Sequence, residues 1–174
     1  MGILLIPVGE VKMKVVETLR YDIKKAFGKQ VWIGRGMPHP DYAMNRKRDQ
    51  YLSTLILKAM MGIKESAIYE RILGIVDLDL YVPKLNFVFG EASQRVAIIS
   101  LTRLRDEFYH LPKDESLFRK RVLTEATHEL GHTYGLEHCR IPHCVMFFSN
   151  SLIDTDTKGP DFCPKCKNKI SRSL

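Results

Sequence analysis

Two histidines and a glutamate in the segment 128–132 have types and a spacing that suit a metal ion. His128 and His132 are four residues apart, and four residues of an α-helix rise about 6 Å and turn about 400°. Both imidazole rings therefore project from one face of a helix, where their nitrogens can meet one zinc ion at about 2.0–2.1 Å. Glu129 lies on the same broad face, so its carboxylate can reach a zinc-bound water without binding the metal.

A third histidine extends this pattern. Gly135 follows His132 by three residues, and His138 follows Gly135 by three. Glycine can take a positive φ, end the helix and reverse the chain, which lets the third imidazole approach the same ion. Three histidines and one open position for water are the ligand set of a catalytic zinc ion. The competing interpretation is solvated histidines at the end of an ordinary helix, and we favour the metal site.

All four cysteines follow residue 138, as Cys139-x4-Cys144-x18-Cys163-x2-Cys166. Two close pairs separated by a loop suit a tetrahedral zinc site with four cysteine ligands. A redox C-x-x-C would need a βαβ context, and a disulfide would need an oxidising compartment. We predict a structural zinc that staples a segment too small to have its own core. Because His138 adjoins Cys139, we expect loss of this ion to damage the histidine site.

The elements that position these residues follow from hydrophobic periodicity. Helices are predicted at 11–27, 50–61 and 114–134, and a loop at 37–41. Strands are predicted at 2–8, 30–34 and 71–82, with a hairpin of 86–89 and 95–101 around Gly90–Ser93. After Cys139 we expect little periodic structure. This order predicts an α+β fold, in which helices pack on a mixed, twisted sheet and a short zinc-stapled segment follows the active-site helix.

We divide the chain into two subdomains of one compact catalytic domain. Residues 1–138 would form the sheet-and-helix subdomain, and residues 139–174 a small C-terminal subdomain with the four cysteines. A length of 174 residues with 45% hydrophobic residues suits one domain with a real core. We favour a monomer, and the sequence leaves the oligomeric state open.

Charge and hydropathy narrow the classes of partner. A net charge of +7 permits acidic partners, but the basic clusters 46–48 and 119–121 are not interleaved with aromatic residues. Nucleic-acid binding is therefore not favoured. No apolar run approaches the length of a membrane span. The N-terminal residues lack the basic region and the cleavage site of a signal peptide, so we expect no membrane partner and a cytoplasmic location.

The combined pattern His-Glu-x2-His-x2-Gly-x2-His-Cys-x4-Cys-x-Met-x16-Cys-x2-Cys, over residues 128–166, resembles the archaemetzincin family of metzincin zinc peptidases. The segment 80–90, LYVPKLNFVFG, is also similar to that family. The resemblance implies a metzincin, zincin-like fold with two zinc ions per chain, one catalytic and one structural. It implies Glu129 as the general base and Met146 as the methionine of a turn beneath the metal. It implies these ligands: His128, His132 and His138 for the catalytic zinc, and Cys139, Cys144, Cys163 and Cys166 for the structural zinc.

We therefore predict a zinc metallopeptidase, an aminopeptidase or an oligopeptidase, that hydrolyses short peptides with a zinc-bound water. An extended substrate would pair with an edge strand, for which 86–90 is the candidate; a strand packed in the core is the other interpretation. We expect Tyr134 to pack and His143 to lie in a loop, and Phe148 cannot supply the tyrosine ligand of some metzincins. The alternative function is a zinc-stabilised basic binding module, for nucleic acid or protein, with a little-used or empty histidine site. A binding module needs no general base, so Glu129 favours catalysis.

Overall fold

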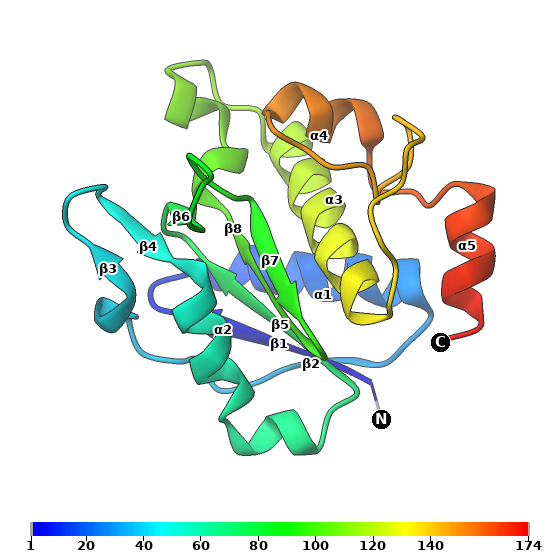
Figure 1. Cartoon of the computed structure of the whole chain (residues 1–174), viewed down its shortest axis with the longest axis horizontal. Coiled ribbons are helices and arrows are strands. Elements are labelled where there is room, and N and C mark those ends of the chain that lie inside the picture. The colour runs from blue at the N-terminus through cyan, green and yellow to red at the C-terminus, as the bar shows by residue number, and fades with distance from the viewer. Residues whose placement is uncertain (1, 174) are drawn as a thin grey trace.

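The computed structural model describes residues 2–173, which fold around a five-stranded sheet of order β2-β1-β5-β8-β7. The strands in that order are Val31–Ile33, Ile3–Val8, Arg71–Val76, Val96–Ser100 and Gly90–Ser93. The first four are parallel, whereas β7 is antiparallel to β8 and forms one edge. Helices α1 (Met13–Phe27) and α3 (Glu115–Thr133) cover one face, and α2 (Ser53–Met61) packs on the other (Figure 1). The predicted α+β fold with a mixed sheet is confirmed.

The central strands are buried on both faces, which explains why they read as continuous apolar runs. In β1 all six residues are buried. Ile3 and Leu5 join the core beneath α1 and α3, whereas Leu4 and Ile6 join the core beneath α2. This alternation fixes the register of the strand, because a shift by one residue would exchange the two sets. The active-site helix α3 therefore rests on a sheet that is packed on both sides.

A second sheet of three short strands corrects two predicted boundaries. It contains β3 (Met44–Asn45), β4 (Gln50–Leu52) and β6 (Leu80–Tyr81). The helix predicted at 50–61 is thus wrong over its first three residues. The strand predicted at 71–82 is also wrong as one element, because the chain leaves the large sheet after Val76. Two aspartates lie at the break and form ion pairs: Asp77 with Arg105 and Asp79 with Arg103, each at 2.6 Å.

The predicted hairpin has the correct partners but the wrong turn. Gly90–Ser93 form strand β7, and the chain reverses at Gln94 and Arg95, with Gln94 at φ 54°. Residues 86–89, the predicted strand, instead lead into β7 and form a single bridge through Val88. Gly90 is therefore a strand residue rather than a turn residue, and the close approach of a side chain from α3 accounts for the glycine.

The C-terminal segment is also more regular than predicted. It contains α4 (Leu152–Lys158) and α5 (Pro164–Ser171). Ser151 caps α4 through its side chain, and Cys163 caps α5, which begins with a proline as many helices do. Between these helices and α3, the residues Cys144, Val145 and Met146 are fully buried in the core that α1 and α3 share. Among residues 2–173, none of the helices combines the length and the apolar character needed to span a membrane.

Candidate active site

Helix α3 presents the first two histidines as a pair with defined ring orientations. The Nε2 atoms of His128 and His132 lie 3.1 Å apart. Each Nδ1 lies 2.7 Å from a backbone carbonyl oxygen, that of Val145 for His128 and that of Leu136 for His132. When Nδ1–H donates to a carbonyl, the lone pair of Nε2 is left free for a metal. Two nitrogens bound tetrahedrally to one zinc lie about 3.3 Å apart, which matches this pair.

The end of α3 brings the third histidine to the same point. Gly135 takes φ 85°, and the N–H of Leu136 donates to the carbonyl of Gly131 at 3.0 Å, as in a common helix C-terminal motif. The chain then reverses, and His138 stands beside the pair. The donor atoms of His128, His132 and His138 all lie within 4.8 Å of one another. The structure therefore brings together the three residues that the sequence pattern predicts as ligands.

The three imidazoles are in the protonation state that a metal requires. Burial lowers the pKa of His128 well below its ordinary value, and the charge of Lys158 lowers it further. Burial also lowers the pKa of His132 and that of His138. These shifts favour the neutral form of each ring, in which a lone pair is available for a metal. A set of three neutral imidazoles with one open side fits a catalytic zinc ion.

Met146 supports the histidines from below. Its side chain is fully buried, and its sulfur packs against Gly131, where an added Cβ would lie only 2.4 Å from it. Its carbonyl accepts a hydrogen bond from the N–H of Cys139 at 2.8 Å, which connects the turn to the residue after His138. Since Val145 also fixes the ring of His128, this turn positions two of the three histidines.

Glu129 points into the same space from α3. Its side chain is buried, which raises its pKa well above the ordinary value, and the nearby charge of Glu125 adds to this rise. Gly90 of the edge strand β7 lies directly against it, because an added Cβ there would be 2.6 Å from Glu129 Cγ and 2.8 Å from Glu129 Oε1. The glycine thus makes room for the carboxylate at the edge of the sheet.

We expect Gly90→Ala to lower kcat/KM for peptide cleavage by about 100-fold, because misplacing a catalytic group by about 1 Å has an effect of this size. The new methyl group would also lie 2.6 Å from the backbone oxygen of Ile98, so β7 cannot simply move away. The measurement is steady-state kinetics. The zinc content is measured on the same sample and should not change. Gly62→Ala is the control, since its nearest atom would be 3.4 Å away. Equal activity of the two variants would contradict the role of Gly90.

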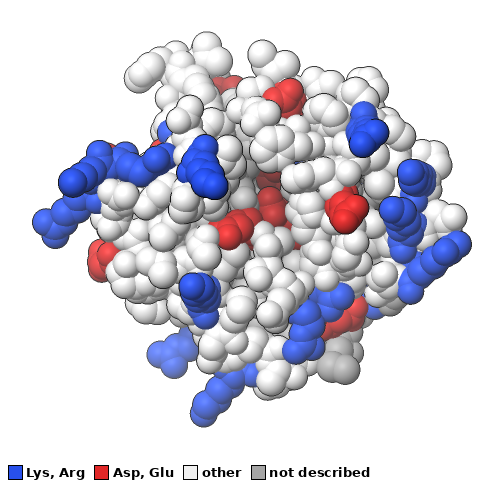
Figure 2. All heavy atoms as spheres, viewed as in Figure 1, with Lys and Arg blue, Asp and Glu red and all other residues white. Residues whose placement is uncertain are grey.

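A cleft of about 290 Å³ is lined by His128 and Glu129. Its walls are the segments 84–90 and 148–150, and its inner end is formed by Glu125, His128 and Glu129. Figure 2 shows acidic side chains gathered in a hollow at the centre of this face, with lysines and arginines around it. The cleft reaches Gly90, the first residue of β7, and the outer edge of β7 has no neighbouring strand among residues 2–173. An extended chain could therefore pair with β7 while it passes the three histidines.

A buried ion pair lies behind His128, and no motif in the sequence signals it. Lys158 of α4 and Glu125 of α3 have side chains that are 0% and 3% exposed, and their charged atoms lie 3.2 Å apart. The ammonium group also donates to the carbonyl of Phe147 at 3.2 Å, and Thr155 donates to Glu125 at 2.7 Å. Lys158 Nζ lies 3.3 Å from His128 Nδ1. The pair therefore connects α3, α4 and the methionine turn around one of the histidines.

We expect Lys158→Met to lower the free energy of unfolding by about 3–5 kcal/mol, because the carboxylate of Glu125 would remain buried without its cation. Chemical denaturation measures this change. The double variant Lys158→Met/Glu125→Gln should recover much of the loss, since it removes both charges. If the single and double variants were equally destabilised, packing of the lysine stem rather than charge would be the cause.

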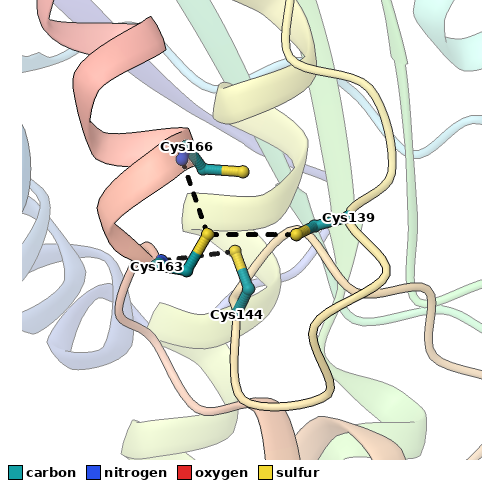
Figure 3. Close-up of side chains that lie close together, drawn as sticks. All are labelled: Cys139, Cys144, Cys163 and Cys166. Carbon is teal, nitrogen blue, oxygen red and sulfur yellow. Dashed lines mark hydrogen bonds between the residues drawn. The ribbon is translucent and has the colours of Figure 1, made fainter.

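The four cysteines form a second cluster of donors, shown in Figure 3. Cys139 and Cys144 come from the loop after α3, and Cys163 and Cys166 come from the start of α5. Their sulfur atoms all lie within 4.8 Å of one another, and those of Cys139 and Cys163 are 3.9 Å apart. Sulfurs bound tetrahedrally to zinc at about 2.3 Å lie about 3.8 Å apart, so the cluster fits a structural zinc ion.

The start of α5 also favours a thiolate at Cys163. Burial raises the pKa of this thiol, but the N–H of Cys166 and the neighbouring thiols outweigh it and lower the pKa to about 7. A backbone N–H at a helix N-terminus stabilises a negative sulfur in this way. Zinc binds thiolates rather than thiols, so the lowered pKa of Cys163 favours the form that a zinc ion would bind.

The remaining predicted residues lie as follows. Tyr134 is buried and stacks on Phe27 at 5.8 Å, so its predicted packing role is confirmed. His143 is an exposed loop residue, as predicted. Phe148 is 40% exposed, and the centroids of its ring and that of His138 lie 5.0 Å apart. Phe148 forms part of the cleft wall. The segment 86–90 lines the cleft, but the edge strand beside it is Gly90–Ser93.

Comparisons with known proteins identify relatives over nearly the whole chain. The model of peptidase family M54 matches residues 9–172. The chain is 41% identical to an archaemetzincin of Pyrococcus abyssi, over 99% of this chain and 95% of that protein. It is 43% identical to an archaemetzincin of Methanocaldococcus jannaschii, over 98% of this chain and 93% of that protein.

Solved structures show the same relationship. The crystal structure of an archaemetzincin from Methanopyrus kandleri is similar with a TM-score of 0.86 at 36% identity, over 99% of this chain and 95% of that chain. The crystal structure of an archaemetzincin from Archaeoglobus fulgidus, complexed with malonate, is similar with a TM-score of 0.85 at 37% identity, over 97% of this chain and 99% of that chain. These matches span the sheet, the histidines and the cysteines alike, and the chain belongs to the archaemetzincin family of zinc metallopeptidases, peptidase family M54.

Proposed function

We propose that this protein hydrolyses peptide bonds in its cleft, with Glu129 as the general base and a zinc ion held by His128, His132 and His138. The observation that carries the proposal is the position of Glu129, a buried carboxylate beside three converging imidazoles on the wall of a cleft. A site that only bound a metal would gain nothing from this carboxylate, since the three imidazoles are already neutral ligands.

The residues of the chain divide the chemistry between them. Zinc, when bound, polarises a carbonyl oxygen and lowers the pKa of a coordinated water. Glu129 accepts the proton of the attacking water and then donates it to the leaving amine. The carbonyls of Val145 and Leu136 keep the histidine rings oriented throughout.

The strand β7 sets the direction of the substrate. A peptide that pairs with its free edge in the antiparallel sense has its C-terminal half beside the residues before Gly90 and its N-terminal half beside Glu91–Ser93. The segment 84–89 and the wall 148–150 would then enclose residues on the C-terminal side of the scissile bond. Only an extended chain can pair in this way, so we propose short or unstructured peptides as substrates. The protein would then act as an aminopeptidase or an oligopeptidase.

We further propose two zinc ions per chain, the second held by Cys139, Cys144, Cys163 and Cys166. The support is the 3.9 Å spacing of two of the sulfurs and the shared location of all four. This ion would be structural, since four thiolates leave no open position for water.

The test is hydrolysis of a mixed peptide library by the zinc-loaded protein, with zinc per chain measured on the same sample. We expect two zinc ions and cleavage that stops when a chelator removes the ion at the histidines. Products that differ by single N-terminal residues would assign an aminopeptidase, and internal cuts an oligopeptidase. A fully loaded protein that cleaves no peptide in the library would contradict the proposed function.

A further inference from the structure

The edge strand β7 carries a carboxylate whose charge no cation among residues 2–173 neutralises in an ion pair. This carboxylate, Glu91, accepts hydrogen bonds from two hydroxyl groups at the start of α2, those of Ser53 and Thr54, the latter at 2.9 and 3.1 Å. Hydroxyl groups orient a carboxylate but leave its negative charge in place. The ion pairs of the described residues all involve other acidic groups. Such a group is prepared for a cation that arrives from outside.

Glu91 directly follows Gly90, the residue of β7 that lies against Glu129. Gly90 abuts Glu129 on the α3 face of the sheet, and successive residues of a strand point to opposite faces. The hydrogen bonds to Ser53 and Thr54 place the Glu91 carboxylate on the α2 face accordingly. The side chain is only partly buried, so it can meet a chain that pairs with the edge of β7.

The two carboxylates that line the cleft, those of Glu125 and Glu129, already have roles. Glu125 forms a buried ion pair with Lys158, and Glu129 is needed for proton transfer. Glu91 forms none of the ion pairs recorded among residues 2–173, so its charge remains to attract a ligand. The whole chain has a net charge of +7, yet Figure 2 shows acidic side chains in the central hollow of this face. Cations are therefore drawn to the hollow against the overall charge of the protein.

We propose that Glu91 binds a cationic nitrogen of the substrate on the N-terminal side of the scissile bond. This inference rests on the proposed function and names a class of substrate for the same cleft. In an antiparallel pair, the scissile peptide must lie level with Gly90 for Glu129 to serve it, and the preceding residue then lies level with Glu91. Cross-strand neighbours on one face have Cβ atoms about 4.5–5.5 Å apart, within reach of a charge-assisted hydrogen bond.

Two nitrogen cations can occupy this position. One is the free α-amino group of a peptide. If Glu91 binds this group, the scissile bond is the one that follows the first residue of the substrate. The other is the side chain of lysine or arginine in a longer peptide. The carboxylate has acceptor capacity left for either, since an ionised carboxylate has about four acceptor positions and the two hydroxyl groups donate one hydrogen each.

The experiment measures peptide binding separately from turnover. The zinc-loaded Glu129→Gln protein and the double variant Glu129→Gln/Glu91→Gln are titrated with four peptides by calorimetry. The peptides are Lys-Ala-Ala-Ala and norleucine-Ala-Ala-Ala, each with a free or an acetylated N-terminus. We expect the peptides with the recognised cation to bind about tenfold more tightly, and Glu91→Gln to abolish that preference. The amide that Glu91→Gln introduces keeps an oxygen that accepts from Ser53 and Thr54, and thermal unfolding checks that α2 is intact.

The arms of the experiment separate the outcomes. A preference lost on acetylation assigns the α-amino group, and one lost on replacing lysine by norleucine assigns a side chain. Equal binding of all four peptides, no binding of any, or a preference that survives Glu91→Gln would overturn the inference. Glu17→Gln, an exposed charge change on α1 in the same Glu129→Gln background, is the control. Turnover of the same peptides by the wild type tests the proposed function independently: a Glu91-dependent preference without cleavage would contradict that function alone.

Discussion

Replacing Glu129 by glutamine should reduce kcat/KM for peptide hydrolysis by about 10²–10⁴-fold, the contribution of one positioned general base. The amide has nearly the size of the carboxylate, so it fits beside Gly90 without new strain. It cannot accept a proton from water, however, and the neighbouring carboxylate cannot take over. Glu125 forms an ion pair with Lys158 and accepts a hydrogen bond from Thr155. Kinetics with one cleaved peptide, at a fixed pH and zinc concentration, measure the effect.

The same variant should keep its zinc at the histidines, because Glu129 is proposed to act on water rather than on the metal. Zinc per chain and thermal unfolding are therefore measured alongside the rate. Glu137→Gln is the matched control, since Glu137 is exposed between His132 and His138 and makes the same change of charge nearby. A Glu129→Gln protein with unchanged activity would remove the general base from the mechanism. A protein that lost the metal instead would make Glu129 a ligand or a structural support.

The sequence predicts which histidines and cysteines come together in space, because their convergence depends largely on local spacing. His128 and His132 need only a helix to share a face, and Gly135 needs only a positive φ to return the chain toward them. The two cysteine pairs are similarly local. What brings these pieces together in space, the packing of the 139–147 loop under α3, is implied only by resemblance to a family.

The features that the sequence does not predict all depend on contacts between distant segments. Gly90 looks like a turn residue because glycine favours turns, but its role is set by Glu129, 39 positions later in the chain. Lys158 and Glu125 look like ordinary surface charges of two helices, and only the packing of α4 on α3 buries them together. The strand predicted at 71–82 breaks at Asp77 and Asp79, whose arginine partners come from residues 103–105, later in the chain. No period of hydrophobic residues contains such information.

The second prediction of large effect concerns the proposed coupling between the histidine site and the cysteine site. Cys163→Ala should remove one of four thiolates and thereby the tight binding of the structural ion. The segment 139–147 would lose its anchor to α5, although it carries both the Val145 carbonyl that orients His128 and Met146 beneath the helix. Groups that orient a metal ligand change metal affinity by about 10–100-fold when they are lost. We therefore expect zinc affinity at the histidines, measured by competition with a chelator, to fall by a similar factor.

The loss of affinity should be accompanied by lower stability, because binding of a structural zinc is coupled to folding of the segment that binds it. Lys167→Ala, an exposed change on α5 four residues from Cys163, is the control and should alter neither quantity. A Cys163→Ala protein with one zinc per chain, wild-type affinity at the histidines and full peptidase activity would show that the sites are independent. The opposite outcome, a parallel loss of both ions, would explain why the ligand His138 is followed directly by the ligand Cys139: the backbone between them would transmit the order imposed by one metal to the site of the other.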